Sequence, residues 1–451
     1  MLNTVFNYID ENFEKFISDL REICRIPSIA AQNVGIVEAV DKLRVMFEDA
    51  GLNVRVLNVD KGNPLLYAEY KPRSYKKTLL FYNHYDVQPP DPLDLWVTPP
   101  FEPSIRDGKI FARGVADNKG NIIARLKAVE SMLNVFGDLP IAVKFVVEGE
   151  EEIGSPSLPG YVKSYGNMFS ADAGIWEFGY RDVSGRPVIT LGVRGIAYFE
   201  FRVKGPRVDV HSGEAAIIPN PAWRLIYFLN SLRSDDGRIL IDGFYDDLKP
   251  VEREDEELLK SIPFNDEDII KRLGIRGFVG GVRGFEALKS MLFNPTCNID
   301  GLYSGYIGQG SKTIIPSHAM AKVDFRLPPG LTCQSLLEKL KRHMDKYGFN
   351  DIEVSLLSGY EAAKTDLKAE IVKVALSSAR EIYGLEPIVY PISSGSGPMY
   401  LFVNELKIPM ISVGVGYHES NNHSPNENIR LEDFKLGIKH IVKIIDMMGR
   451  M

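Results

Sequence analysis

Four glutamates crowd into the five residues 148–152, directly after the apolar run 141–147. The run is rich in β-branched residues and predicts a buried strand, so the acids follow the strand's carboxyl end. In open α/β sheets, ligands bind at that edge. Crowded carboxylates repel one another unless a cation compensates them, and hard divalent metals prefer oxygen ligands. Taken alone, such a stretch more often forms a solvated turn, so a metal centre needs support from other strand ends.

A second buried strand, at 78–83, leads directly into His84-Tyr85-Asp86. In an extended chain His84 and Asp86 point to the same side. We interpret His84 as a metal ligand and Asp86 as the partner that fixes the tautomer of its imidazole. The alternative, which a single such pair favours, is a histidine that is hydrogen-bonded at a strand end.

Three further candidate ligands lie at the start of a predicted helix or after a predicted strand. Asp117 lies at the start of a predicted helix, where it could serve as an N-cap or as a bridging carboxylate. Glu177 follows the strand predicted at 173–176, and His423 lies in the loop after the strand at 408–415. Because we expect all these elements to end at one sheet edge, their joint pattern favours a metal centre over a set of solvated turns.

Composition limits the remaining classes of function. The chain has 451 residues, which predicts two domains, and its net charge of −7 without a basic run argues against a nucleic-acid partner. The three cysteines are far apart in the sequence, and we interpret them as free thiols. No apolar run reaches spanning length and no signal-peptide pattern opens the chain, so we expect a cytoplasmic protein without a membrane partner.

The strand pattern changes in the middle of the chain. Residues 198–203 and 319–326 alternate between apolar and polar side chains, which is typical of half-exposed antiparallel strands. The outer strands are instead continuously apolar. We therefore predict an α/β fold in which 1–191 and 361–451 form a catalytic domain with a mainly parallel sheet flanked by helices. Residues 192–360 would form an inserted α+β lid and dimerisation domain.

At this point the sequence resembles the M20 metallopeptidases, in particular the branch of cytosolic non-specific dipeptidases and carnosinases. The resemblance covers nearly the whole chain. Its motifs are His84-Tyr85-Asp86-Val87-Gln88-Pro89, Phe101-Glu102-Pro103, Gly114-Val115-Ala116-Asp117-Asn118-Lys119-Gly120, Glu151-Glu152-Ile153-Gly154-Ser155, Val210-His211-Ser212-Gly213 and His423-Ser424-Pro425-Asn426-Glu427. It implies two divalent metal ions per chain, with zinc as the first choice and manganese or cobalt as alternatives.

The resemblance also implies a role for each candidate ligand. His84 and Glu177 match the terminal ligands of one metal, and Glu152 and His423 match those of the other. Asp117 matches the carboxylate that bridges the two metals.

Three further residues match catalytic positions of the family. Glu151 matches the general base, and Asp86 matches the residue that supports the first histidine ligand. The resemblance implies that the lid forms a homodimer and that His211 reaches into the partner subunit's active site. There an imidazole could donate a hydrogen bond to the oxyanion.

Substrate recognition is predicted from two segments. The loop that contains Ser394, Gly395, Ser396 and Gly397 offers hydroxyls and backbone N–H groups, and it occupies the place of the family's substrate-carboxylate loop. Arg326 resembles the family's carboxylate-binding arginine. Without the resemblance, a flexible turn and an exposed strand arginine would be sufficient explanations.

We therefore predict a two-metal hydrolase that cleaves the amide bond of dipeptides or short peptides next to a free C-terminal carboxylate. An N-acyl-amino-acid deacylase of the acetylornithine deacetylase or succinyl-diaminopimelate desuccinylase type would use the same metals and the same base. A metal-free binding or scaffold homologue is the third hypothesis, and it predicts at least one missing ligand.

Overall fold

The computed structural model describes residues 2–451, which form two compact units. Unit 1 takes in the described residues up to Gly192, together with Lys364–Pro391 and Pro398–Met451. Unit 2 takes in Val193–Ala363 and Ile392–Gly397. These units differ from the predicted domain ranges mainly in the short segment 392–397, and the domain roles themselves stay predictions. No helix within residues 2–451 has the length and apolar character needed to cross a membrane.

Unit 1 is built on one mixed sheet whose centre is parallel. Strands β6, β3, β7 and β19 lie side by side in that order and run in the same direction, whereas β1 and β2 pair antiparallel at one margin. In spatial order the strands are β1 (Asn53–Leu57), β2 (Leu65–Tyr70), β6 (Ala142–Glu148), β3 (Thr78–His84), β7 (Ala173–Trp176), β19 (Met410–Ser412), β9 (Pro187–Thr190), β8 (Tyr180–Arg181) and β20 (Gly416–Tyr417), with β17 (Ile388–Tyr390) paired to β9.

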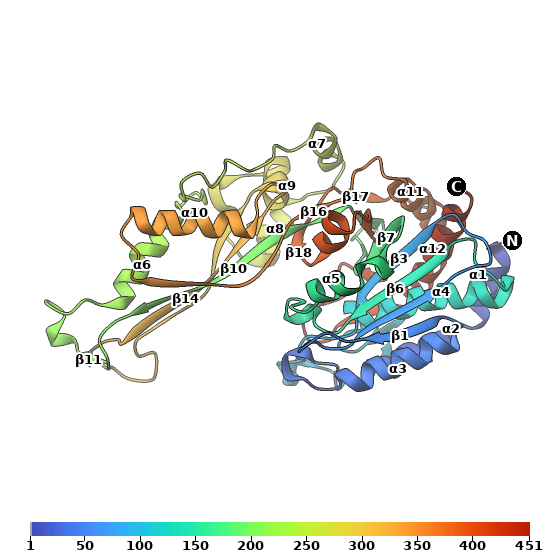
Figure 1. The fold of residues 1–451 in the computed structure, drawn as a ribbon, viewed down its shortest axis with the longest axis horizontal. Helices are drawn as coiled ribbons and strands as arrows, with labels where there is room; N and C mark the ends of the chain where they lie inside the picture. The colour runs from blue at the N-terminus through green and yellow to red at the C-terminus, as the bar shows by residue number, and fades with distance from the viewer. Residues whose placement is uncertain (1) are drawn as a thin grey trace. The chain divides into compact units, whose positions relative to one another are not determined.

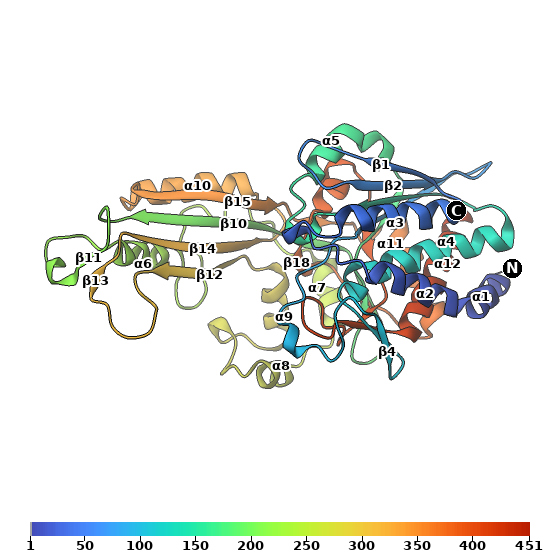
Figure 2. The ribbon, with the colours of Figure 1, turned by 90° about the horizontal axis from the view of Figure 1, so that it is seen from below.

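Helices pack around this sheet (Figures 1 and 2). Helix α3 contacts β1 and β2, α5 contacts β6, and α4 contacts both β3 and α12. The helices are α1 (Leu2–Glu11), α2 (Phe13–Cys24), α3 (Ile36–Asp49), α4 (Gly120–Phe136), α5 (Leu158–Phe169), α11 (Glu370–Tyr383) and α12 (Leu431–Gly449). A small antiparallel sheet completes the unit with β4 (Ser104–Arg106), β5 (Lys109–Phe111) and β21 (Asn428–Arg430).

The parallel centre of the sheet is deeply buried, as its continuous apolar sequence predicts. The rings of Phe81 on β3 and Phe145 on β6 lie 4.7 Å apart, and Phe47 of α3 meets Phe145 edge-on at 4.9 Å. Tyr82 and Trp176 stack across β3 and β7 at 4.3 Å. This packing fixes the register of the strands, and with it the positions of the side chains that follow their carboxyl ends.

The N-terminal helical pattern differs from the sequence expectation in one respect. The apolar spacing over 2–24 predicts a helix, whereas the structure divides the segment into α1 and α2 at Asn12. The Asn12 side chain donates a hydrogen bond to the carbonyl of Tyr8 at 2.9 Å. Such a local side-chain bond competes with the regular backbone pattern and so marks a break between helices.

Unit 2 has an antiparallel sheet in the order β12, β14, β10 and β15, with β16 and β18 paired to β10. These strands are β10 (Gly192–Lys204), β12 (Thr296–Ser304), β14 (His318–Leu327), β15 (Ile352–Tyr360), β16 (Ala363–Lys364) and β18 (Ser393–Ser396), and β11 (Val210–His211) pairs separately with β13 (Ile314–Ile315). The helices of the unit are α6 (Pro221–Leu232), α7 (Arg253–Lys260), α8 (Asp266–Leu273), α9 (Gly284–Phe293) and α10 (Cys333–Lys346).

The alternating strands of unit 2 bury one face against helices. Phe201 of β10 packs edge-on against Phe228 of α6 at 4.8 Å, and Leu340 of α10 belongs to the same buried cluster. Asp324 and Arg326 alternate with apolar residues along β14 and project from the opposite face, where Asp324 is also buried and Arg326 is partly exposed. The sheet therefore has one apolar face for its core and one polar face.

Candidate metal centre

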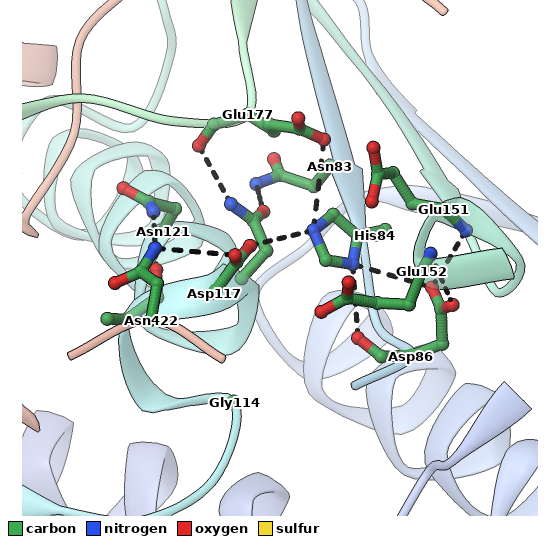
Figure 3. A network of polar contacts seen from close by, with 12 residues as sticks. Asn83, His84, Asp86, Gly114, Asp117, Asn121, Glu151, Glu152, Glu177 and Asn422 are labelled. Atoms are coloured by element: carbon green, nitrogen blue, oxygen red, sulfur yellow. Dashed lines mark hydrogen bonds and ion pairs between the residues drawn. The ribbon is translucent and has the colours of Figure 1, made fainter. Parts of the chain in front are cut away.

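The predicted ligands of unit 1 meet at the carboxyl edge of the parallel strands (Figure 3). His84 ends β3, and Glu151 and Glu152 lie in the 3₁₀ turn η4 (Glu151–Ile153) shortly after β6. Glu177 directly follows β7. Because β3, β6 and β7 are parallel neighbours, side chains from three separate parts of the chain reach one place.

Asp117 stands between two histidines. Its Oδ1 lies 3.1 Å from Nε2 of His84, and its Oδ2 lies 3.1 Å from Nε2 of His423. Asp117 belongs to the π-helical turn η3 (Val115–Lys119) that precedes α4, and its backbone angles are not helical. Each oxygen of this one carboxylate therefore serves a different imidazole, which is the arrangement that a bridging ligand requires.

Glu152 and Glu177 complete the cluster, each beside a different histidine. Oε2 of Glu152 lies 3.3 Å from Nε2 of His423, and Oε2 of Glu177 lies 3.8 Å from Nε2 of His84. Ligand atoms of His84, Asp117 and Glu152 all lie within 4.8 Å of one another. Glu177 thus lies next to His84 and Glu152 next to His423, whereas the group of ligand atoms within 4.8 Å joins Glu152 to His84 and Asp117 as well.

Asp86 holds the neighbouring turn in place. Its Oδ1 accepts a hydrogen bond from the backbone N–H of Glu151 at 3.2 Å, and its Oδ2 accepts one from Glu152 at 3.0 Å. The same Oδ1 lies 3.4 Å from Nδ1 of His84. Nδ1 of His84 is also within hydrogen-bond distance, 3.0 Å, of the Asp86 backbone carbonyl, so the buried Asp86 orients the histidine through its main chain and the glutamate pair through its carboxylate.

The pKa values of the histidines and of Glu177 are shifted upward at this edge of the sheet. Hydrogen bonds to Asp117 and Glu152 raise the pKa of His423 to about 10. Burial lowers the pKa of His84, but its contacts with Asp117 and Asp86 outweigh burial and raise that pKa well above its usual value. Burial raises the pKa of Glu177 to about 8. The upward shifts of the two histidine pKa values have one cause in common, the crowding of carboxylates beside the imidazoles, and such crowding favours the binding of cations.

The donor set fits divalent cations. Imidazole nitrogens and carboxylate oxygens are the ligands that zinc takes in hydrolytic sites, and they also suit manganese. Oε2 of Glu177 is buried and accepts no hydrogen bond within residues 2–451, so a buried acceptor is aimed into the cluster without a donor. A cation beside His84 would satisfy this oxygen, because metal ligation replaces the missing hydrogen bond.

Glu427 is a positioning residue whose role was not predicted from the motif that contains it. Its buried carboxylate accepts hydrogen bonds from the backbone N–H groups of Gly114 at 2.9 Å, Ala116 at 2.8 Å and Asp117 at 3.0 Å. Arg113 adds an ion pair at 2.7 Å. Glu427 therefore ties the loop of His423 to the loop of Asp117, and its place four residues after His423 was the signal available in the sequence.

The positioning roles of Arg125 and Asn118 were also not predicted from the sequence. Arg125 projects from α4 and donates to the carbonyls of Tyr82 at 2.7 Å and Glu177 at 3.0 Å, so it links the ends of β3 and β7. The side chain of Asn118 donates to the same Glu177 carbonyl at 2.9 Å. A buried arginine in the middle of a helix has no local sequence signal, because its partners lie on other strands.

The predicted substrate-binding residues belong to unit 2. Nη1 of Arg326 donates to Oγ of Ser396 at 2.9 Å, and that hydroxyl donates to the carbonyl of Gly195 at 3.1 Å. Strand β18 carries Ser394, Gly395 and Ser396 and pairs in parallel with β10. Gly397 ends the same segment of the unit. The structure thus brings the predicted arginine and the predicted loop together.

His211 lies elsewhere in unit 2. It is exposed on β11, whose partner β13 precedes β14, whereas Arg326 lies near the far end of β14. Figures 1 and 2 show β11 and β18 at opposite ends of the long sheet of this unit. Nδ1 of His211 accepts a hydrogen bond from the N–H of Gly213 at 3.0 Å, so the neutral ring carries its proton on Nε2.

Comparison with known proteins identifies the family. The model of peptidase family M20/M25/M40 matches residues 80–447, and the chain belongs to this family. The chain is a metallopeptidase. Among solved structures it is similar to an M20 family metallo-carboxypeptidase, Sso-CP2 from Sulfolobus solfataricus, with 39% identity, a TM-score of 0.92 and coverage of 97% of this chain and 99% of that one.

Two related dipeptidases match the chain over nearly its whole length. A Beta-Ala-His dipeptidase of Homo sapiens is 29% identical over 97% of this chain and 91% of the relative. A Cys-Gly metallodipeptidase of Schizosaccharomyces pombe is 27% identical over 97% of this chain and 96% of the relative. The match therefore includes both compact units.

The geometry around Asp117 generates a prediction for Asp117→Ala. Each remaining pair, His84 with Glu177 and Glu152 with His423, offers only two protein ligands, so metal content should fall below two ions per chain. Metal analysis after gel filtration in metal-free buffer measures this directly. Asp60→Ala, at an exposed position in a turn, is the matched control and should retain the wild-type metal content. Two tightly bound ions in Asp117→Ala would show that Asp117 is not a shared metal ligand.

Proposed function

We propose that the chain is a two-metal hydrolase that cleaves the amide bond of dipeptides or short peptides next to a free C-terminal carboxylate. The observation that carries the proposal is the Asp117 carboxylate, whose two oxygens lie 3.1 Å from His84 and from His423. In this proposal His84 and Glu177 hold one cation, Glu152 and His423 hold the other, and Asp117 is shared.

The charges of the ligand set support this assignment. Asp117, Glu152 and Glu177 carry three negative charges, and two divalent cations carry four positive charges, so the loaded site keeps a net charge of about +1. When bound, the cations polarise the scissile carbonyl and make water more acidic. Zinc is the first choice for this nitrogen and oxygen donor set, with manganese or cobalt as alternatives.

Glu151 is the proposed general base. It lies next to the ligand Glu152 in η4, and the hydrogen bond from its backbone N–H to Asp86 fixes its place at the edge of the cluster. Burial raises the pKa of the Glu151 carboxyl, with nearby Glu177 as a further cause. The carboxylate accepts a proton from the attacking water and delivers it to the leaving amine.

The variant Glu151→Gln separates proton transfer from metal binding. Since Glu151 is not a ligand in this proposal, the variant should retain two cations per chain and lose roughly 10²- to 10⁴-fold in kcat. Turnover is to be measured on protein of verified metal content. Glu14→Gln, on the exposed side of α2, is the control and should keep normal turnover. Near-normal activity of fully loaded Glu151→Gln would assign the base to another residue, with Glu150 the first candidate.

Arg326 and Ser396 are the proposed carboxylate-binding groups. The guanidinium is held by Asp324 at 3.1 Å and by Ser396 at 2.9 Å, which leaves donors available for a substrate carboxylate. The names of the relatives support this substrate class, since a metallo-carboxypeptidase and dipeptidases all act on peptides. They favour a peptidase over the N-acyl-amino-acid deacylase hypothesis.

A substrate panel tests the proposed function. Dipeptides such as Ala-Ala should be hydrolysed, whereas the C-terminal amide of the same dipeptide should react at least ~10²-fold more slowly, because the amide leaves Arg326 without an anionic partner. N-acetyl amino acids should be poorer substrates than dipeptides. Equal rates on the acid and the amide would contradict the role of Arg326, and a preference for N-acetyl amino acids would favour the deacylase.

We further propose that the chain forms a homodimer through unit 2. Trp223 and Tyr227 stack at 5.8 Å on the exposed side of α6, and Ile217 is also exposed nearby in sequence. Such an apolar patch is typical of a subunit interface. In this dimer His211 acts in the partner's active site, where its Nε2–H donates a hydrogen bond to the oxyanion.

Mixed dimers test the role of His211 across the interface. His211→Ala should stay folded and metal-replete but turn over about 10²- to 10³-fold more slowly, since one oxyanion donor is lost. In a dimer of one His211→Ala chain and one Glu151→Gln chain, one site has both residues intact. Activity should therefore recover to about half of the wild-type total if the sites act independently. Verified mixed dimers without recovery would exclude action across the interface.

A further inference from the structure

Unit 2 contains a cavity of about 770 Å³ that the proposed function has not used. Its walls come from α8, the segment between α8 and α9, and strands β12 and β14. The volume lies within the range of roughly 300–1,000 Å³ that small-molecule sites occupy. All of its lining residues belong to unit 2.

One wall of the cavity is apolar and exposed. Phe264 and Phe278 approach each other with ring centroids 6.3 Å apart, and Leu273, Ile275 and Val279 line the same wall. Leu273 is 56% exposed and Val279 is 59% exposed, so these side chains lack cover within their own chain. Exposed apolar side chains gathered around a cavity indicate a site for an apolar group.

The other end of the cavity is polar and contains Arg326. Nε of Arg326 donates to Oδ1 of Asp324 at 3.1 Å and Nη1 donates to Oγ of Ser396, whereas Nη2 makes no hydrogen bond within residues 2–451. The side chain is 34% exposed and lines the cavity. The guanidinium is therefore oriented by its neighbours and still has an unused donor on Nη2.

The acidic groups near Arg326 are already engaged. Asp324 accepts from Arg326 and also from the Asn298 side chain at 3.1 Å. Asp300 accepts from Asn298 at 2.7 Å, and burial together with the neighbouring Asp324 raises the pKa of Asp300. At this end of the cavity the ion pair with Arg326 compensates the charge of Asp324, and the apolar wall opposite favours an apolar occupant.

We propose that this cavity binds the side chain of the substrate's C-terminal residue and selects large apolar residues such as leucine and phenylalanine. The inference rests on the proposed function, in which Arg326 binds the C-terminal carboxylate. The Cα atom that carries this carboxylate also carries the side chain. A carboxylate on Arg326 therefore brings that side chain to the mouth of the cavity, within reach of its apolar wall.

A series of dipeptides with constant N-terminal alanine tests the selection. We expect kcat/KM for Ala-Leu and Ala-Phe to exceed that for Ala-Ala by ~10- to ~200-fold, since each buried methylene group contributes to discrimination. Ala-Lys and Ala-Glu should be poorer substrates than Ala-Leu. Similar values for Ala-Leu and Ala-Ala, or a preference for Ala-Lys, would overturn the proposal.

A variant that places a charge in the apolar wall tests whether this wall contacts the substrate side chain. Val279→Asp should lower the ratio of kcat/KM for Ala-Leu over Ala-Gly by about tenfold or more, because it places a carboxylate beside the bound side chain. The control is Val183→Asp, at an exposed valine between β8 and β9, which should keep the wild-type ratio. An unchanged ratio in Val279→Asp, with a change in molecular mass by light scattering, would instead show that a second copy of the chain covers this wall.

Binding of free amino acids separates this inference from the proposed function. Calorimetry should show that L-phenylalanine binds at least ~10-fold more tightly than L-alanine, and that Val279→Asp removes the difference. If no dipeptide is hydrolysed but this difference is present, the proposed function fails and the pocket stands. If dipeptides are hydrolysed and the two amino acids bind equally, the pocket assignment is wrong and the proposed function stands.

Discussion

The position of Asp117 is the constraint on which the rest of the site depends. One carboxylate must present its two oxygens to two imidazoles from distant parts of the chain, at 3.1 Å each. Glu427 makes this possible because its carboxylate accepts hydrogen bonds from three backbone N–H groups of the Asp117 loop. Glu427 lies only four residues after His423, so it ties the two loops together. Asp86 likewise accepts hydrogen bonds from the backbone N–H groups of Glu151 and Glu152 and so holds the glutamate pair near His84. The buried carboxylates that hold the loops are thus distinct from those that face the cluster.

In the proposed function, unit 2 supplies the groups that recognise the C-terminal residue of the substrate. Arg326 is oriented by two partners and retains a free donor, and the apolar cavity begins beside it. We propose that unit 2 recognises charge and shape separately: the guanidinium would bind the carboxylate, and the cavity would distinguish among side chains.

The sequence predicted the sheet edge well because that information is local. Continuous apolar runs identify buried parallel strands, and the residues that follow them must meet at one edge, as His84 and Glu177 do. What the sequence could not provide depends on distant partners. The tie from Glu427 to Asp117 spans 310 residues, and Arg125 reaches several strand ends from the middle of a helix. The cavity in unit 2 could not be predicted because its walls come from α8, the segment after it and two strands that only the folded chain brings together.

The most direct test of the account is anomalous X-ray diffraction from crystals of the metal-loaded protein. The account predicts two anomalous peaks per chain, roughly 3.5–4 Å apart, on either side of the Asp117 carboxylate. One peak should lie in ligand distance of His84 and Glu177, and the other in ligand distance of Glu152 and His423. A single peak, or two peaks that do not share Asp117, would contradict the bridging arrangement from which the proposed mechanism is derived.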